Sequence, residues 1–308
     1  MKSTFTAMKF RNVIESYLKR YDTFLLIASI ILFGSGVMAQ DKPAYTIFSS
    51  NGKKATYTRM VKDLTRADVV FFGELHNNPI AHWLELEVAK SLYETNANLV
   101  LAMEMFETDD QIVVDEYLKG KIGETHLLSE AKVWDNYQTD YKPLVDFAKI
   151  NGLKLIATNI PRRYANLVYR KGLSSLDSLS REALAWITPL PIQIDLELSG
   201  YKNMIDQMEG HGVGTGKNLA ISQAIKDATM AHFILKNKTS DNIIFHINGA
   251  YHSQNGEGIL WYVRQLRPET RMATIHVVEQ NEIDKLASQN IGTADYIICV
   301  PESMTKTF

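Results

Sequence analysis

The chain has 308 residues, of which 45% are hydrophobic and 22% are charged, and its formal net charge is −2. This composition is typical of a globular protein, and without a basic stripe there is no electrostatic reason to expect a nucleic-acid partner. The single cysteine, Cys299, excludes an intramolecular disulfide framework and a cysteine-rich metal site. Because Cys299 lies in an apolar run, we interpret it as a buried structural thiol.

The first 39 residues have the pattern of a signal peptide. Five basic residues precede an apolar stretch from Phe24 to Phe33, and Val37-Met38-Ala39 fits the small-x-Ala pattern of a cleavage site. About ten apolar residues are too few to span a bilayer comfortably. We therefore expect export to the periplasm or cell envelope, with cleavage after Ala39, and an uncleaved anchor is the alternative. No cysteine follows the apolar stretch, so we do not expect a lipoprotein.

Beyond residue 40, apolar strands alternate with helices. The apolar run 69–72 stops at Gly73, which is typical of a strand buried on both faces, and a helix follows it. Repetition of this unit predicts right-handed crossovers and a mainly parallel sheet flanked by helices, an α/β fold. The expected strands are 45–48, 69–72, 98–104, 153–158, 241–247, 273–278 and 296–300, and the expected helices are 58–64, 79–93, 108–119, 141–150, 218–235 and 258–267.

The region from about 165 to 215 interrupts the alternation. It contains helical fragments and the turn Thr188-Pro189-Leu190-Pro191, but no convincing buried strand. We interpret it as a helical cap inserted into a single α/β domain of residues 40–308. Met204, Ile205 and Met208 form an apolar stripe there. Such a stripe is more often core, although on a cap it could cover a flat apolar ligand.

Polar residues follow four of the expected strands: Glu74 and His76, then Glu104, then Asn159 with Arg162, and finally His252. Because parallel strands place their carboxyl ends at one edge of a sheet, we expect these side chains to share a crevice. The set Glu74, His76, Glu104 and His252 could bind a divalent metal such as Zn, Fe, Ni or Mn. The same four residues could also act without metal, with Glu74 or Glu104 as a base on water and His252 as its partner.

Further candidates suit an anionic or haem ligand. Arg162 could hold a carboxylate or propionate bidentately. His82, six residues beyond His76, is expected to face the crevice from the first turn of its helix. Tyr251 is one of several tyrosines near the crevice or cap, and either tyrosine or histidine can ligate a haem iron. For each tyrosine the alternative is simple packing with a hydrogen-bonded hydroxyl.

The motifs, taken in order, resemble those of the ChaN-like haem-binding proteins, within the Tiki/TraB/erythromycin-esterase-like superfamily. The resemblance covers roughly residues 65–270. It implies an α/β fold with a helical cap in an exported, often lipid-anchored protein linked to haem binding and iron uptake. The matching motifs are Gly73-Glu74-x-His76-x-Asn78-Pro79-x-x-His82, Leu101-Ala102-Met103-Glu104-Met105-Phe106, Ala157-x-Asn159-x-Pro161-Arg162, Asp227-x-x-Met230-Ala231 and Gly249-x-x-His252-x-x-x-Gly256-x-Gly258.

The resemblance also implies a site at Glu74, His76, Glu104 and His252, which could be catalytic because superfamily relatives include proteases and hydrolases. Two features depart from the family pattern. The chain has no cysteine at the cleavage point, and no motif identifies a tyrosine that would ligate haem.

The leading hypothesis is therefore a haem-binding protein of the cell envelope that takes part in haem or iron uptake. The alternative is an envelope hydrolase, esterase-like or protease-like, with or without a metal, so whether the chain is an enzyme stays open. Its expected ligand is haem or another small molecule. Whether it also contacts outer-membrane uptake machinery or forms a homodimer stays open. The candidate haem-binding residues are His76, His82, Arg162, Tyr251 and His252.

Overall fold

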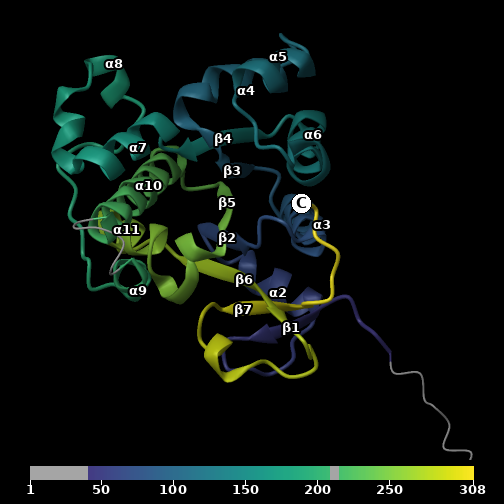
Figure 1. Ribbon diagram of the computed structural model, residues 1–308. Helices are drawn as coiled ribbons and strands as arrows, with labels where there is room; N and C mark the ends of the chain where they lie inside the picture. The colour runs from purple at the N-terminus through teal and green to yellow at the C-terminus, as the bar shows by residue number, and fades with distance from the viewer. Residues whose placement is uncertain (1–40, 209–214) are drawn as a thin grey trace, which may run out of the picture. The chain divides into compact units, whose positions relative to one another are not determined.

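One seven-stranded sheet runs through the part of the chain that the computed structural model describes, residues 41–208 and 215–308. Its strand order is β1-β7-β6-β2-β5-β3-β4 (Figure 1). All neighbouring strands are parallel except the pair β1 and β7. The strands are β1 (Thr46–Ser49), β2 (Val69–Glu74), β3 (Leu99–Glu107), β4 (Lys154–Asn159), β5 (Ile243–Gly249), β6 (Met272–Gln280) and β7 (Tyr296–Pro301).

Helices cover both faces of this sheet (Figure 1). One face carries α2 (Tyr57–Leu64), α3 (Pro79–Thr95), α4 (Gln111–Leu118), α5 (Glu124–Glu130) and α6 (Lys142–Asn151). The other carries α7 (Arg162–Lys171), α8 (Arg181–Leu184), α9 (Ser199–Gln207), α10 (Thr215–Asn237) and α11 (Ile259–Leu266). Short helical turns complete the list: η1 (Thr108–Asp110), η2 (Tyr137–Tyr141), η3 (Leu173–Ser178), η4 (Ala250–His252), η5 (Gln254–Gly256) and η6 (Ser288–Asn290).

The residues of β2 show why the sheet is buried on both sides. Val70 and Phe72 belong to the hydrophobic cluster beneath α3, whereas Val69 and Phe71 belong to the cluster beneath α10 and α11. This alternation follows the two-residue period of a strand, and an uninterrupted apolar run is what a strand with two covered faces requires. The predicted α/β fold with a mainly parallel sheet and flanking helices is confirmed.

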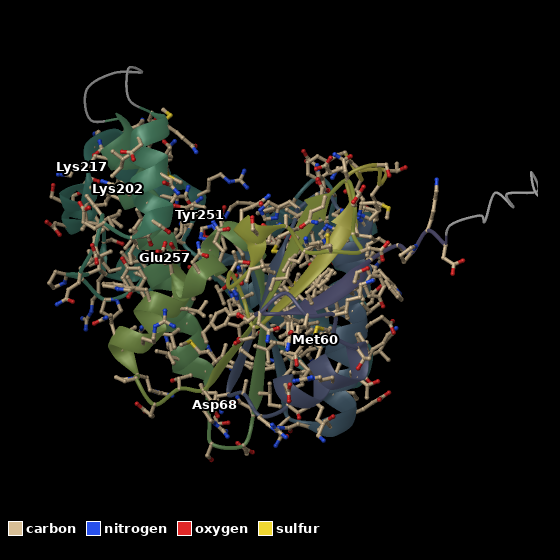
Figure 2. The ribbon with its side chains drawn as sticks, turned by 90° about the horizontal axis from the view of Figure 1, so that it is seen from below. Met60, Asp68, Lys202, Lys217, Tyr251 and Glu257 are labelled. Carbon is tan, nitrogen blue, oxygen red and sulfur yellow. The ribbon has the colours of Figure 1, made fainter. Side chains whose placement is uncertain are left out.

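Between β4 and β5, the described residues form helices and turns but no strand, as the predicted helical cap requires. Glu257 ties this segment to the loop after β5, because its carboxylate accepts hydrogen bonds from the backbone nitrogens of Ser199 (3.0 Å) and Gly200 (2.8 Å). Figure 2 shows Tyr251 and Glu257 on the side of the sheet that faces these helices. The cap therefore lies against the loop that follows β5.

Strand β3 continues to Glu107, three residues further than predicted. Its pairing with β5 ends at Met103 and Ile247, and its register with β4 shifts between Met103 and Glu107. Glu104 lies where β3 and β5 separate, and its Oε2 accepts a hydrogen bond from the backbone nitrogen of Gly249 at 2.8 Å. The Glu104 carboxylate thus accepts the hydrogen bond of the Gly249 backbone nitrogen where the backbone pairing of β3 and β5 has ended.

The predicted signal segment, residues 1–39 with cleavage after Ala39, lies outside the described residues. In the part of the chain that the structure describes, no helix combines the length and the apolarity needed to cross a membrane.

Candidate functional site

The sheet topology brings three polar strand ends together. Strands β2, β5 and β3 are neighbours in the sheet, and their carboxyl ends lead to His76, His252 and Glu104. The chain leaves β2 towards β3 on one side, and it leaves β5 towards β6 on the other. Such a change of direction is where open α/β sheets place their ligands.

A cavity of about 360 Å³ lies at this edge of the sheet. Its volume is within the range of small-molecule sites. Five candidate residues line it, and Asn159, Trp134, Met204 and Lys226 add to its wall. The candidates on the wall are His76, Glu104, Arg162, Tyr251 and His252.

Two candidate residues, Glu74 and His82, are not among the described residues that line the cavity. Glu74 shares the strand face of Val70 and Phe72, so the pleat directs it under α3, where it is 1% exposed. His82 was expected to face the crevice, but the first turn of α3 directs its ring inward instead. There its Nε2 lies 3.1 Å from the carbonyl oxygen of His76.

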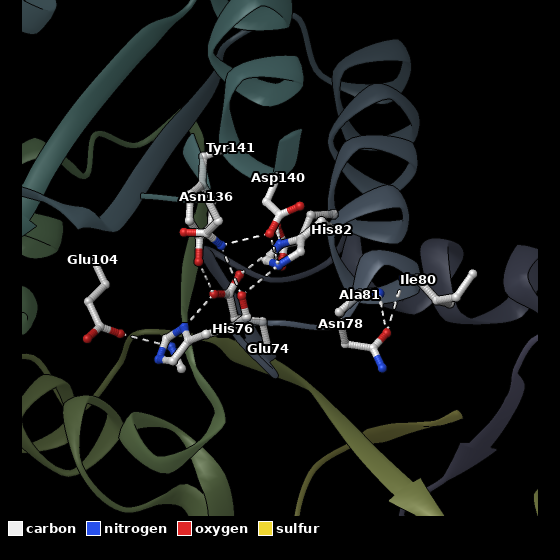
Figure 3. Close-up of polar contacts among 12 residues, drawn as sticks. Glu74, His76, Asn78, Ile80, Ala81, His82, Glu104, Asn136, Asp140 and Tyr141 are labelled. Atoms are coloured by element: carbon white, nitrogen blue, oxygen red, sulfur yellow. Dashed lines mark hydrogen bonds and ion pairs between the residues drawn. The ribbon is translucent and has the colours of Figure 1, made fainter. Parts of the chain in front are cut away.

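Glu74 nevertheless positions His76 from behind (Figure 3). Its Oε1 lies 2.6 Å from His76 Nδ1 and accepts a hydrogen bond from the Tyr141 hydroxyl at 2.7 Å. Burial raises the pKa of Glu74 to about 8. Burial alone would lower the pKa of His76, but the hydrogen bond to Glu74 and the charges of Glu74 and Glu104 together outweigh burial, and the pKa is raised. His76 is therefore held at Nδ1, and among the described residues its Nε2 has no hydrogen-bond partner.

Gly249 gives the His76 ring the space it occupies. A Cβ atom on residue 249 would lie 2.6 Å from His76 Nε2 and 2.8 Å from its Cε1. We expect Gly249→Ala to displace the ring, which lowers the free energy of unfolding by about 1–2 kcal/mol and returns the pKa of His76 towards its ordinary value. Urea denaturation and a histidine NMR titration measure the two effects.

Gly123→Ala is the matched control for this substitution, because a Cβ there meets nothing within 4 Å and the backbone φ is −83°. An unchanged His76 titration in Gly249→Ala would show that the ring does not depend on the missing side chain.

A second, buried group of side chains lines the same cavity as His76. His252 Nε2 is 3.3 Å from Glu104 Oε1, and His252 Nδ1 is 2.5 Å from Asp227 Oδ1. Tyr201 donates its hydroxyl to the other oxygen of Asp227 at 2.6 Å. The four side chains form one chain of contacts that runs from the sheet into the cap.

These contacts favour the charged forms of Glu104 and His252. Burial alone would lower the pKa of His252, but Glu104 and Asp227 outweigh it and raise the pKa to about 10. Burial likewise opposes ionisation of Glu104, yet His252, with His76 and Lys226, holds the pKa of Glu104 well below its usual range. At neutral pH the geometry therefore describes an imidazolium between two acidic groups, with both ring nitrogens engaged.

Several residues of this site were not singled out from the sequence. Asp227 stood in a family motif without a role, and its signal was a carboxylate on a long helix with Ala224 and Met230 one turn away on either side. Tyr141 and Tyr201 were two tyrosines among many. Glu85 carried no signal beyond its position three residues after His82.

The candidate metal residues divide into two pairs, Glu74 with His76 and Glu104 with His252. A different set of metal-ligating atoms lies close together in the described residues: Glu74, His82 and Glu85. A third set, Glu107, Asp109 and Asp110, already contacts Lys132 Nζ at 3.1–3.3 Å. The positive charge of Lys132 therefore compensates the negative charge of the third set.

Comparison with known families shows which family the chain belongs to. The sequence model described as haem-binding uptake, Tiki superfamily, ChaN matches residues 60–263. The chain belongs to this family. The resemblance inferred from the strand-end motifs is confirmed, and the matched range includes every candidate site residue.

A solved structure of the family, cofacial heme binding to ChaN of Campylobacter jejuni, has the same fold. It is 17% identical, with a TM-score of 0.62, over 84% of this chain and 98% of that one. A curated relative from Arabidopsis thaliana, the chloroplastic protein RETICULATA-RELATED 5, is 29% identical over 131 residues. That match takes in 40% of this chain and 18% of the relative, so the chain spans less than a fifth of the relative's length.

Proposed function

We propose that the protein binds haem in the cavity at the carboxyl edge of the sheet, with His76 as the iron ligand. The observation that carries the proposal is the state of the His76 ring. Its Nδ1 is held by the buried carboxyl group of Glu74 at 2.6 Å, and its Nε2 has no hydrogen-bond partner in the described residues. Carboxylate support of this kind fixes the tautomer of a ligating histidine and raises its basicity.

The other residues of the wall fit a haem. The Arg162 side chain is 76% exposed, and its one ion pair in the described residues, with Glu107, is long at 3.8 Å. A guanidinium in this state is available to a propionate. Trp134 and Met204 supply apolar surface. When bound, haem would supply an iron that a histidine or tyrosine side chain of the wall can ligate.

His252 and Tyr251 are less suited to ligate the iron. Both nitrogens of His252 are engaged by carboxylates, and its pKa of about 10 keeps it protonated at neutral pH. The Tyr251 hydroxyl is buried without a hydrogen-bond partner, and burial raises its pKa, which disfavours the phenolate. We therefore assign His252 and Tyr251 to the wall and His76 to the iron.

A haemin titration tests this assignment. We expect the wild-type protein to shift the Soret band at micromolar haemin, and His76→Ala to raise the dissociation constant at least about tenfold through loss of the axial ligand. His126→Ala is the matched control, because that side chain is 64% exposed and is not among the described residues that line the cavity. A wild-type protein that leaves the haemin spectrum unchanged would refute the proposal.

We also propose that the protein acts in haem or iron uptake in the cell envelope. The family description supports an uptake role, and the pattern of residues 1–39 supports export. The mass of the protein recovered from an envelope fraction tests the export step, since cleavage after Ala39 leaves a chain that begins at Gln40. A full-length chain in the cytoplasm contradicts it.

A second candidate function is hydrolysis. The proposed ligation of haem iron does not use the series of contacts that joins Tyr201, Asp227, His252 and Glu104. A buried imidazolium beside an ionised carboxylate, both on a cavity wall, can transfer protons to a bound substrate. Haem-free protein assayed against esters and peptides tests this function. Turnover that Glu104→Gln abolishes would support it, and no turnover across the panel argues against it.

A further inference from the structure

Glu74, His82 and Glu85 form a buried group behind the cavity that the proposed haem site does not use as ligands. Their side chains are 0%, 4% and 1% exposed. His82 and Glu85 are three residues apart on α3, so they share one face of the helix, and that face lies over the end of β2. Figure 3 shows His82 and Glu74 turned towards each other between these elements. One potential ligand atom from each residue lies within 4.8 Å of the other two.

Two distances within the group, one of them a long hydrogen bond between His82 and Glu85, also match the spacing of ligands around an ion. His82 Nδ1 lies 3.4 Å from Glu74 Oε2 and 3.3 Å from Glu85 Oε2. Hydrogen bonds between such groups are normally about 2.7–2.9 Å long, as is nearly true of the 2.6 Å contact between Glu74 and His76. In a tetrahedral site with bonds of about 2.1 Å, neighbouring ligand atoms are about 3.4 Å apart.

Two oxygen atoms in this group also need a partner. Glu74 Oε2 and Glu85 Oε1 are buried, and neither makes a hydrogen bond. The two carboxyl groups are close enough that each affects the protonation of the other. No lysine or arginine of the described residues forms an ion pair with either of them. Because unpaired buried oxygens are costly, a cation or a shared proton must compensate them.

The contacts of His82 Nε2 suit an imidazole that binds a metal through its other nitrogen, Nδ1. Its Nε2 lies 3.1 Å from the carbonyl oxygen of His76 and 3.4 Å from Asp140 Oδ2. Asn136 donates hydrogen bonds to both of these oxygens, at 3.0 Å and 2.7 Å, which holds them in place. The proton of a neutral His82 is thereby favoured on Nε2, and Nδ1 keeps its lone pair.

We propose that Glu74, His82 and Glu85 bind a divalent transition-metal cation, with zinc as the best match to the donors. Two carboxylates neutralise its charge, and one imidazole with two carboxylate oxygens leaves one tetrahedral position open. Calcium is a poor match, because it takes six to eight oxygen ligands. The site is separate from the cavity, and it holds Glu74, whose other oxygen positions His76.

Zinc content measured on the tag-free full chain tests the proposal. The protein is loaded with zinc, passed through a desalting column and analysed by mass spectrometry of the metal. We expect about one zinc per chain in the wild type and almost none in Glu85→Gln. His76→Ala should keep its zinc, because the three proposed ligands remain and Tyr141 still donates its hydroxyl to Glu74. Glu94→Gln, an exposed position on the same helix, is the matched control.

X-ray absorption of the zinc-loaded wild type provides a test that needs no variant. One imidazole and oxygen neighbours at about 2.0–2.1 Å support the buried group, whereas two imidazoles indicate the cavity pair His76 and His252. The proposal is overturned by two imidazoles, by loss of zinc in His76→Ala, by retention in Glu85→Gln, or by a wild type that binds none. The last result would mean that the two carboxyl groups share a proton. None of these measurements depends on haem.

Discussion

Asp227→Asn is expected to lower the free energy of unfolding by about 3 kcal/mol or more, since removing one partner of a buried charge pair leaves the other uncompensated. His252 Nδ1 lies 2.5 Å from Asp227, and both side chains are buried. Asparagine keeps the size of the side chain and can still accept the Tyr201 hydroxyl. The decrease in the free energy of unfolding therefore measures the contribution of the negative charge on residue 227. Urea denaturation of wild type and variant measures it.

The stability lost in Asp227→Asn should depend on pH, and the titration of His252 determines the direction of that dependence. Its pKa is 6.5 in the unfolded chain and about 10 in the folded protein, so its stabilising effect is complete below 6.5 and disappears as pH rises through 10. The difference between wild type and Asp227→Asn should thus be larger at pH 6.5 than near pH 10. Asp177→Asn, at an exposed position, should show no such difference. An Asp227→Asn penalty below 1 kcal/mol at pH 6.5 would contradict the charged pair.

The edge of the sheet that holds the site could be predicted from sequence because topology dictates it. Parallel strands send Glu104, Arg162 and His252 to the same edge, and the structure places all three on one cavity wall. The inward direction of Glu74 was also contained in the sequence, since it falls in step with Val70 and Phe72. Reading residue 74 as part of the strand, and not as a loop residue, would have placed it under α3.

The partners of the site residues could not be predicted in this way. Asp227 and His252 are 25 positions apart in the sequence, and Tyr141 and Glu74 are 67 apart. These contacts depend on how helices α3 and α10 and the turn η2 are rotated and packed against the sheet. The apolar pattern fixes the buried face of a helix but not which neighbour each residue of that face meets. Glu85 illustrates this, because only the packed position of α3 brings it to Glu74.

Glu85→Gln is expected to become more stable than wild type as pH rises, in protein kept free of metal by a chelator. Burial, joined by the charge of Asp140 and opposed by the hydrogen bond to Glu74, raises the pKa of Glu85 to about 7 from an ordinary value of 4.5. The folded protein therefore binds more protons than the unfolded chain between these values, so wild type loses stability as pH rises from 4.5 through 7. Glutamine resembles the protonated carboxyl and does not titrate.

The stability difference between Glu85→Gln and wild type should grow by about 3 kcal/mol from pH 5 to pH 8, as a pKa shift of that size implies. Denaturation at the two pH values measures it, and Glu94→Gln should follow wild type throughout. A difference that stays constant with pH would show that Glu85 is ionised in the folded protein without a metal. With zinc present the order at pH 8 should reverse, because the cation stabilises the wild type and has lost a ligand in the variant. The carboxyl groups of Glu74, at the end of β2, and Glu85, on α3, would then alternate between a proton and a cation, and His76 would be positioned by Glu74 in either state.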